Sequence, residues 1–208
     1  MKERGILAVV SGFSGAGKGT IMKALLERYD NYALSISATT RKPREGEQHG
    51  REYFFVGEEE FEQMIAEDRL IEYARYVDHY YGTPKDYVMS QLEAGKDVIL
   101  EIEIQGALKV KEKFPETLLV FVTPPSAEEL KRRLVNRGTE TAEVIEARMK
   151  RACEEAEQMD RYDYLLINDE VDLCTEKLHR LIQAQHGKMT LHGEFVSRMK
   201  QELKDISE

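Results

Sequence analysis

The chain has 208 residues, of which 41% are hydrophobic and 33% charged, so it is large enough to bury a core and is composed like an ordinary globular protein. Thirty basic residues stand against 39 acidic ones, and the resulting charge of −9 disfavours general nucleic-acid binding, which depends on basic patches. No apolar run approaches the ~20 residues that span a bilayer, and the first apolar run is too short for a signal peptide. These features predict a cytoplasmic protein that binds neither a membrane nor nucleic acid.

The two cysteines, Cys153 and Cys174, belong to no metal-binding pattern. In a reducing compartment we expect two buried, unpaired thiols. The five histidines also lack partner ligands at metal-binding spacing, and we expect them at the surface.

Apolar runs predict buried strands at residues 5–10, 97–104, 117–123 and 164–167, and the first of these runs shows no alternation. A helical pattern begins near Lys18 and places Ile21, Leu25 and Leu26 on one side. The remaining runs alternate with segments of helical spacing. A strand, a glycine-rich turn and a helix in succession, followed by this alternation, predict an α/β fold with a parallel sheet.

Two segments interrupt this alternation. Residues 35–92 are rich in glycine, proline and aromatic side chains, which predicts a small insert with short strands and a helix over residues 58–67. Residues 126–161 begin with a capping box from Ser126 to Glu129 and continue as two charged helices. The division that follows is a discontinuous core (1–34, 93–125 and 162–187), the insert, the helical segment and a tail (188–208). The tail is predicted to be helical, with Phe195, Met199 and Leu203 on one side.

Residues 12–20, which we call the phosphate loop, read Gly-Phe-Ser-Gly-Ala-Gly-Lys-Gly-Thr and connect the first predicted strand to the first helix. Glycines let successive backbone N–H groups turn toward phosphate oxygens, and the helix adds its positive N-terminal end. Lys18 supplies a mobile charge for the terminal phosphates. The consensus places Ser or Thr directly after the lysine, but here Gly19 stands there and Thr20 follows. The pattern predicts nucleoside triphosphate binding and does not distinguish a kinase from a hydrolase.

The insert contains two arginines, Arg41 and Arg44, on either side of Pro43. Two guanidinium groups on a stiffened loop can chelate a phosphate monoester. A basic turn exposed to solvent, with no ligand, would have the same sequence pattern. Further along the insert, Glu72 could accept two N–H groups from a purine edge. Such a contact would select guanine over adenine, because adenine lacks that donor pair at the same edge.

Together these motifs resemble the guanylate kinase family, whose members transfer the γ-phosphoryl group of ATP to GMP. The phosphate loop is similar to the form found in nucleoside monophosphate kinases, and residues 39–47 match the family signature Thr-Thr-Arg-x-Pro-Arg-x-Gly-Glu. The similarity extends from about residue 5 to about residue 186. It implies an α/β parallel-sheet P-loop NTPase core, a small mixed GMP-binding insert at 35–92 and a helical lid at 126–161.

The resemblance also implies roles for individual residues. ATP would be bound by Gly12, Ser14, Gly15, Ala16, Gly17, Lys18, Gly19, Thr20 and, near the adenine, Asn168. The GMP phosphate would be held by Arg41, Arg44, Tyr53 and Tyr81, and the guanine base would be recognised by Ser37, Glu72, Thr83 and Glu103. The catalytic positions are Lys18, Arg133, Arg137 and Arg148.

Mg²⁺ is the expected cofactor, with Thr20 and Glu101 as its ligands through water. Alternation along the predicted strand 97–104 places Glu101 and Glu103 on one face, at the end of the strand that meets the cleft. Family members often have Asp at the second of these positions. The side chain of Glu103 is one methylene longer, so its contact with guanine is expected to differ.

The expected reaction needs no protein nucleophile, because the phosphate of GMP attacks while the protein positions it and stabilises charge. GMP and dGMP are the expected acceptors, ATP is the co-substrate, and nucleotide recycling and GTP supply are the expected role. Two alternatives remain open. One is a guanylate-kinase-like binding module without catalysis, and the other is a P-loop kinase with a different acceptor. The sequence is compatible with an oligomer and does not predict one.

Overall fold

The structure is a computed structural model that describes residues 4–76, 78–136 and 141–207. Its main sheet has five strands in the order β2-β7-β1-β8-β9, and every pair in it is parallel. The strands are β1 (Leu7–Gly12), β2 (Tyr32–Leu34), β7 (Asp97–Glu101), β8 (Leu118–Thr123) and β9 (Tyr164–Ile167). The predicted α/β class with a parallel sheet is therefore confirmed.

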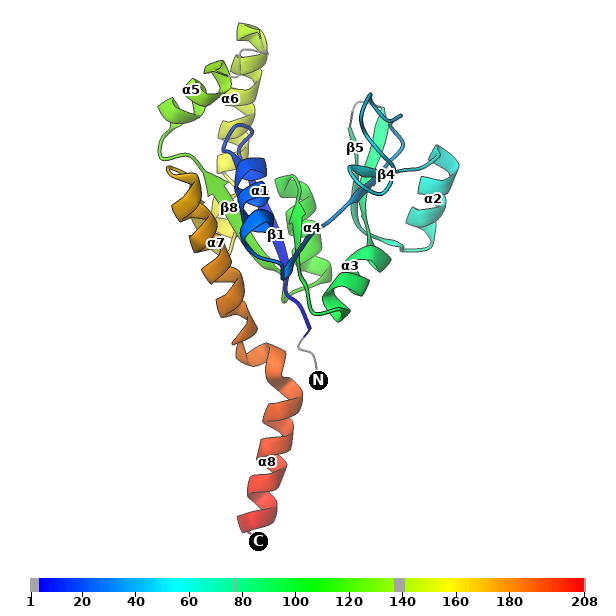
Figure 1. Ribbon diagram of the computed structural model, residues 1–208, viewed down its shortest axis with the longest axis vertical. Coiled ribbons are helices and arrows are strands. Elements are labelled where there is room, and N and C mark those ends of the chain that lie inside the picture. The colour runs from blue at the N-terminus through cyan, green and yellow to red at the C-terminus, as the bar shows by residue number, and fades with distance from the viewer. Residues whose placement is uncertain (1–3, 77, 137–140, 208) are drawn as a thin grey trace.

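Helices cover both faces of this sheet (Figure 1). On one face are α1 (Lys18–Arg28) and α7 (Val171–His186), and on the other are α3 (Lys85–Glu93) and α4 (Ile104–Lys113). The central strand β1 supplies both cores: Ala8 and Val10 pack in the cluster with α1 and α7, whereas Leu7 and Val9 pack in the cluster with α3 and α4. This two-sided burial explains why the sequence of β1 shows no polar alternation.

A smaller sheet has the order β4-β3-β6-β5 and mixes parallel and antiparallel pairs. Its strands are β3 (Ser37–Thr39), β4 (Tyr53–Phe55), β5 (Leu70–Tyr76) and β6 (His79–Pro84), with helix α2 (Glu58–Ala66) beside them. Its separate core contains Ala38, Phe61, Met64 and Leu70. The short strands and the helix lie where the composition of the insert predicts them.

The predicted helical segment forms α5 (Ala127–Asn136), α6 (Ala142–Ala156) and the short 3₁₀ helix η1 (Met159–Arg161). Figure 1 shows α5 and α6 on the side of the molecule where the loop between β1 and α1 lies. The backbone N–H of Glu129 donates to Ser126 Oγ at 3.1 Å. The carboxylate of Glu129 accepts from Arg132 and Arg133, so the predicted capping box is observed only in its serine half.

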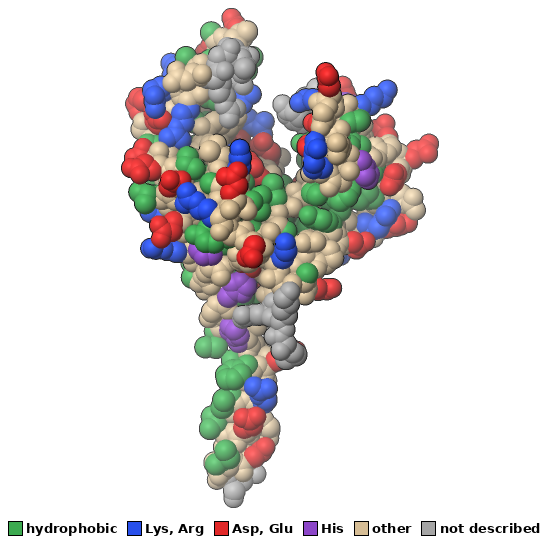
Figure 2. Space-filling view, in the orientation of Figure 1, with side chains coloured by type: hydrophobic (Ala, Val, Ile, Leu, Met, Phe, Trp, Pro, Cys, Tyr) green, Lys and Arg blue, Asp and Glu red, His purple; other side chains and the backbone are tan. Residues whose placement is uncertain are grey.

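The tail consists of the 3₁₀ helix η2 (Met189–His192) and α8 (Gly193–Ser207), which projects away from the body (Figure 1). Among residues 193–207, none is buried. The predicted apolar side is exposed, with Phe195 at 52%, Met199 at 38% and Leu203 at 59% exposure, and Figure 2 shows hydrophobic side chains along one edge of this helix. Within the described ranges, no helix is both long and apolar enough to cross a membrane.

The end of β7, the buried side of α1 and one cysteine differ from the sequence predictions. Strand β7 ends at Glu101, before the predicted Ile104, because Ile104 already begins α4 and is buried under it. Leu26 is 41% exposed, so it does not share the buried side of α1 with Ile21 and Leu25. Cys174 is buried as expected, but Cys153 is exposed.

The expectation of surface histidines is wrong for three of them, which are half-buried and hydrogen-bonded. His179 stacks on Tyr29 and bonds to the hydroxyl of Tyr32 at 2.7 Å. His186 Nε2 lies 2.8 Å from the buried carboxylate of Asp97, and His192 bonds to the carbonyl of His186. They hold α7 and the start of the tail against the amino ends of the strands.

Candidate active site

The phosphate loop begins at the carboxyl end of β1 and leads directly into α1. At two positions in this loop the structure shows why glycine is required. Gly17 has φ 90°, and a Cβ there would lie 2.4 Å from the Asn168 side chain. Gly12 has φ 147°, and its Cβ would lie 2.0 Å from the carbonyl oxygen of Val122 on β8. The loop can therefore approach its neighbours this closely only with glycine at these positions.

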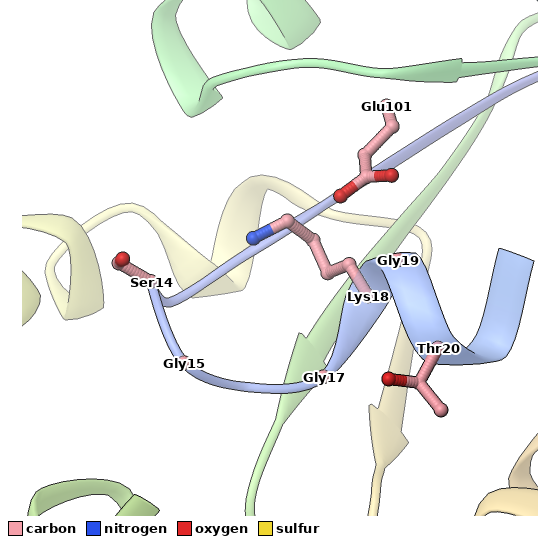
Figure 3. A pocket seen from close by; sticks show the side chains of 7 residues that line it. All are labelled: Ser14, Gly15, Gly17, Lys18, Gly19, Thr20 and Glu101. Carbon is pink, nitrogen blue, oxygen red and sulfur yellow. The ribbon is translucent and has the colours of Figure 1, made fainter. Parts of the chain in front are cut away.

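Lys18 lies across this loop. Its ammonium group donates to the carbonyl oxygens of Gly12 at 2.8 Å and Phe13 at 3.2 Å. Figure 3 shows the Glu101 carboxylate directed toward the outer part of the Lys18 side chain, whereas the side chain of Thr20 points away from both. The cavity here is about 430 Å³ in volume. It is lined by the predicted Ser14, Gly15, Gly17, Lys18, Gly19, Thr20 and Glu101.

The charge of this cavity is mixed. Although Glu101 keeps an exposed side chain, partial desolvation by the surrounding protein raises the pKa of its carboxyl group, and the nearby Lys18 ammonium acts in the opposite direction. Backbone N–H groups and one lysine beside one carboxylate suit a ligand that combines phosphate oxygens with a cation. The carboxylate comes from β7, the neighbouring strand of β1, so the sheet brings together residues more than 80 positions apart.

The helical segment brings two of the predicted arginines onto the phosphate loop. Arg133 of α5 donates to the carbonyl oxygens of Asn168 at 2.9 Å and Ala16 at 3.5 Å. Arg148 of α6 donates to the hydroxyl of Ser14. Both cations thus lie beside the cavity that holds Lys18. Arg137, the third predicted arginine, lies outside the described residues.

Asn168 follows β9 and is only 2% exposed beneath the loop. Its side-chain amide donates to the carbonyl oxygen of Ala16 at 2.7 Å, and its Oδ1 atom is buried without a hydrogen-bond partner among the described residues. This contact supports the backbone of the phosphate loop. The contact of Asn168 with adenine remains a prediction.

A second polar site lies on the smaller sheet, where Arg41 is held from several sides. Its guanidinium donates two bonds of 2.9 Å to the carboxylate of Glu47 and lies 5.3 Å from the ring centre of Tyr53. Glu47, and to a lesser extent Tyr81, raise the pKa of Arg41. Glu47 also accepts the backbone N–H of Arg44 at 2.7 Å.

Sequence reasoning assigned no role to Glu47, although it closes the motif of residues 39–47. The feature of the sequence that could have indicated this contact was the negative charge of Glu47, six positions after the positive charge of Arg41. The predicted aromatic residues lie close by, since the rings of Tyr53 and Tyr81 are 6.0 Å apart. Ser37 is paired with Tyr53 in the register of β3 and β4. The sheet therefore gathers most of the predicted acceptor residues.

Glu72 and Thr83 form the buried part of this second site. Glu72 is 9% exposed, and its carboxylate accepts from the hydroxyl of Thr83 at 2.8 Å. Burial raises the pKa of Glu72, and the bond from Thr83 partly offsets this. The other carboxylate oxygen faces the first turn of α4, where a Cβ on Gly106 would lie 3.1 Å from it.

The alternation predicted that Glu103 would share a strand face with Glu101, and this prediction is wrong. The strand β7 ends at Glu101, and Glu103 is the N-cap residue of α4. Its carboxylate accepts from Arg151 of α6 at 2.6 Å. Arg151 also donates to Glu155 at 2.9 Å. Sequence reasoning did not single out Arg151 or Glu155.

A parallel sheet with a phosphate loop, arginines from a helical segment against that loop and a second polar pocket on an inserted sheet define a P-loop nucleotide kinase. A family model described as guanylate kinase matches residues 4–185. The chain belongs to the guanylate kinase family, whose members phosphorylate GMP using ATP.

Relatives and solved structures agree with this placement. The chain is 55% identical over 189 residues to a guanylate kinase of Bacillus subtilis, which covers 90% of this chain and 93% of the relative. It is 52% identical over 202 residues to one of Caldanaerobacter subterraneus, covering 97% and 98%. The crystal structure of guanylate kinase from Anaplasma phagocytophilum is similar with a TM-score of 0.70 and 31% identity, covering 90% and 89%.

Proposed function

We propose that this chain transfers the γ-phosphoryl group of ATP to GMP, giving ADP and GDP, and that it accepts dGMP as well. The observation that carries the proposal is the contact of Arg133 and Arg148 with the loop that holds Lys18. Cations from a separate helical segment meet at the place where a triphosphate would lie. This arrangement suits the stabilisation of a transferring phosphoryl group.

On the donor side, the loop N–H groups and the N-terminal end of α1 bind the phosphates of ATP. The Lys18 ammonium, which donates to Gly12 and Phe13, exchanges these two carbonyl oxygens for phosphate oxygens. Asn168 and Arg133 keep the Ala16 carbonyl in place, and with it the shape of the loop.

The residues present fit a Mg²⁺ ion. Glu101 offers a carboxylate beside the phosphate loop, and Mg²⁺ in kinases is commonly held by one or two carboxylates, water and the substrate's own phosphates. Thr20 points away from Glu101 (Figure 3), so any contribution from its hydroxyl would pass through water or phosphate. When bound, Mg²⁺ neutralises phosphate charge during transfer.

On the acceptor side, Arg41 and Arg44 with the hydroxyls of Tyr53 and Tyr81 hold the phosphate of GMP. Glu47 fixes the orientation of the Arg41 guanidinium before GMP binds, which lowers the entropy lost on binding. The base is read by Ser37, Glu72, Thr83 and Glu103. The buried Glu72 carboxylate accepts N–H groups of guanine, and a base without these donors leaves it unpaired.

The transfer is a direct displacement. An oxygen of the GMP phosphate forms a bond to the γ-phosphorus of ATP, and the bond from that phosphorus to the bridging oxygen of ADP breaks. Lys18, Arg133 and Arg148, together with Arg137, stabilise the charge on the transferring group. Closure of α5 and α6 as a lid excludes water, which would otherwise hydrolyse ATP.

A coupled ADP-release assay with ATP and Mg²⁺ tests the proposal against GMP, dGMP, AMP, CMP and UMP, each assayed alone. Turnover confined to GMP and dGMP is the expected result. Turnover with another acceptor would support the assignment as a kinase and overturn the proposal that Glu72 and Glu103 recognise guanine. Folded protein that binds GMP without turnover of any acceptor would favour the binding module.

A further inference from the structure

Helix α6 contacts both substrate sites from one side. Arg148 donates to Ser14 in the phosphate loop, and Arg151, one turn later, donates to Glu103 at the N-terminus of α4. Residues three apart on a helix lie on the same side of it. A single turn of α6 therefore connects the donor loop to a carboxylate that lies on the acceptor side.

Arg151 is itself held in place by a residue of its own helix. Its Nε atom donates to Glu155, one turn further along α6, at 2.9 Å. The Glu155 side chain is 14% exposed, whereas that of Glu103 is 73% exposed. The arginine thus joins a sheltered carboxylate to an exposed one, and the sheltered end fixes the direction in which the guanidinium points.

The carboxylate of Glu103 needs such a partner. A glutamate on the surface samples several rotamers, and ordering it costs free energy on each binding event. The first turn of α4, which follows Glu103, packs near the buried carboxylate of Glu72. A Glu103 side chain held by Arg151 is kept on the same side of the acceptor pocket as Glu72.

We propose that Arg151 is a positioning residue that holds the Glu103 carboxylate ready for the guanine base and links it to the helix that contacts the phosphate loop. The inference rests on the proposed function, in which Glu103 contacts GMP. It adds a residue pair, Arg151 and Glu155, that acts through Glu103 and touches neither substrate.

Steady-state kinetics of Arg151→Gln test this inference. We expect the KM for GMP to rise about fivefold, as the loss of a partly exposed charge pair would give, while kcat and the KM for ATP stay within twofold of wild type. Arg151→Lys keeps the charge and should recover part of the loss. The matched control is Arg180→Gln, which removes an arginine paired with Glu176 on the exposed side of α7 and should leave all three constants unchanged.

A double-mutant cycle with Glu103→Gln separates positioning from a general effect on the fold. If Arg151 acts through Glu103, adding Arg151→Gln to Glu103→Gln changes the KM for GMP by less than twofold. A fivefold rise in that background would overturn the inference, as would an equal rise in the KM for ATP or an unchanged KM for GMP in the single variant. Wild-type turnover of GMP is measured first, so failure of the proposed function is recognised independently.

Discussion

The donor and acceptor sites are built from different parts of the chain. The donor site is mainly backbone, in which a contiguous loop has its shape fixed by glycines and by close packing against β8 and Asn168. The acceptor site is mainly side chains, which come from separate strands of a small sheet and hold one another, as Glu47 holds Arg41 and Thr83 meets Glu72. The donor site thus depends on backbone geometry, and the acceptor site on a set of paired polar side chains.

This difference follows from the substrates. Phosphates are bound by successive backbone N–H groups that point toward one place. A loop must turn tightly to present its N–H groups in this way, and few sequences allow so tight a turn. A purine base is recognised by the pattern of its edge, which requires chosen side chains at fixed positions. Damage to the donor site should therefore affect catalysis itself, whereas damage to the acceptor site should affect mainly the affinity for GMP and the choice of base.

The largest effect is expected for Lys18→Ala. Removing the cation from the phosphate loop should lower kcat by about 10³-fold or more, because charge developing on the transferring group loses its partner. Single-turnover and steady-state ADP release measure it. Lys23→Ala, on the exposed side of the same helix, is the matched control and should stay within twofold of wild type. A Lys18→Ala enzyme within tenfold of wild type would contradict the assignment of the donor site.

Gly17→Ala tests whether the donor site depends on backbone geometry. A residue with a side chain at φ 90°, with its Cβ 2.4 Å from Asn168, should destabilise the fold by about 2 kcal/mol and weaken ATP binding. Gly19→Ala is the control for stability, since apart from its chain neighbours and the backbone of its own helix no described atom lies within 4 Å of its Cβ position. Because Gly19 lies in helix α1, alanine at this position should leave the free energy of unfolding unchanged or raise it. Equal unfolding midpoints in denaturant for the two variants would refute this account of the loop.

Glu72→Gln tests the acceptor site and should lower kcat/KM for GMP by about 100-fold, because the amide replaces one of the two acceptor oxygens with an NH₂ group, which cannot accept an N–H of guanine. Isothermal titration with GMP gives the affinity directly. Glu62→Gln, exposed on α2 of the same insert, is the control. An unchanged affinity for GMP in Glu72→Gln would remove Glu72 from the guanine site.

The same variant should change the pH dependence of stability. Burial raises the pKa of Glu72 above its unfolded value, so between these two values the folded chain holds a proton that the unfolded chain has released. Stability therefore decreases as the pH rises through that range. Glu72→Gln should remove this decrease, and above the range the ligand-free variant should be more stable than the wild-type protein. Thermal melts at pH 5 and pH 8 compare the two proteins, and parallel shifts would contradict the prediction.

Glu47→Gln should have a smaller effect, confined to the acceptor phosphate. The Arg41 guanidinium loses one of its two acceptor oxygens and the negative charge of Glu47, and the KM for GMP should rise about tenfold while the preference for guanine is kept. Glu45→Gln, exposed in the same loop, is the control. The kinetics of GMP and of IMP should change by the same factor, and a change in their ratio would show that Glu47 acts on the base.

The two sites also differ in how far the sequence alone predicts them. The phosphate loop is contiguous, and its glycines have a physical reason that spacing reveals, so most of the predicted loop residues line the donor cavity together with Glu101, whereas Gly12 and Ala16 do not line it. The acceptor residues are spread over the insert, and only the resemblance to guanylate kinases assigned Ser37, Tyr53 and Tyr81. Their proximity depends on the register of β3, β4 and β6, which short strands do not specify in advance.

The contacts that support the site residues could not be predicted for a related reason. Glu47, Arg151 and Glu155 are ordinary surface charges in the sequence, and their roles depend on which side chain each one meets. The place where β7 ends was also missed, since Ile102 and Ile104 continue its apolar alternation. The alternation continued because Ile104 is buried by the helix α4 that it begins, and hydrophobic periodicity does not distinguish these two causes of burial.

The smallest effect is expected from removing α8, which belongs to neither site. A chain that ends after His192 loses none of the buried residues that the structure describes, because residues 193–207 contain none, so kcat and both KM values should stay within about twofold of wild type and the unfolding midpoint should not change. A chain that ends after Arg180 is the contrasting variant. It loses the buried Ile182 as well as Gln183 and His186, two hydrogen-bond partners of the buried Asp97 carboxylate. That loss should destabilise the fold by about 3 kcal/mol or more, because it leaves a buried charge short of partners and opens the core. If removal of α8 alone lowered activity or stability to a similar extent, the tail would have to be counted as part of the catalytic body.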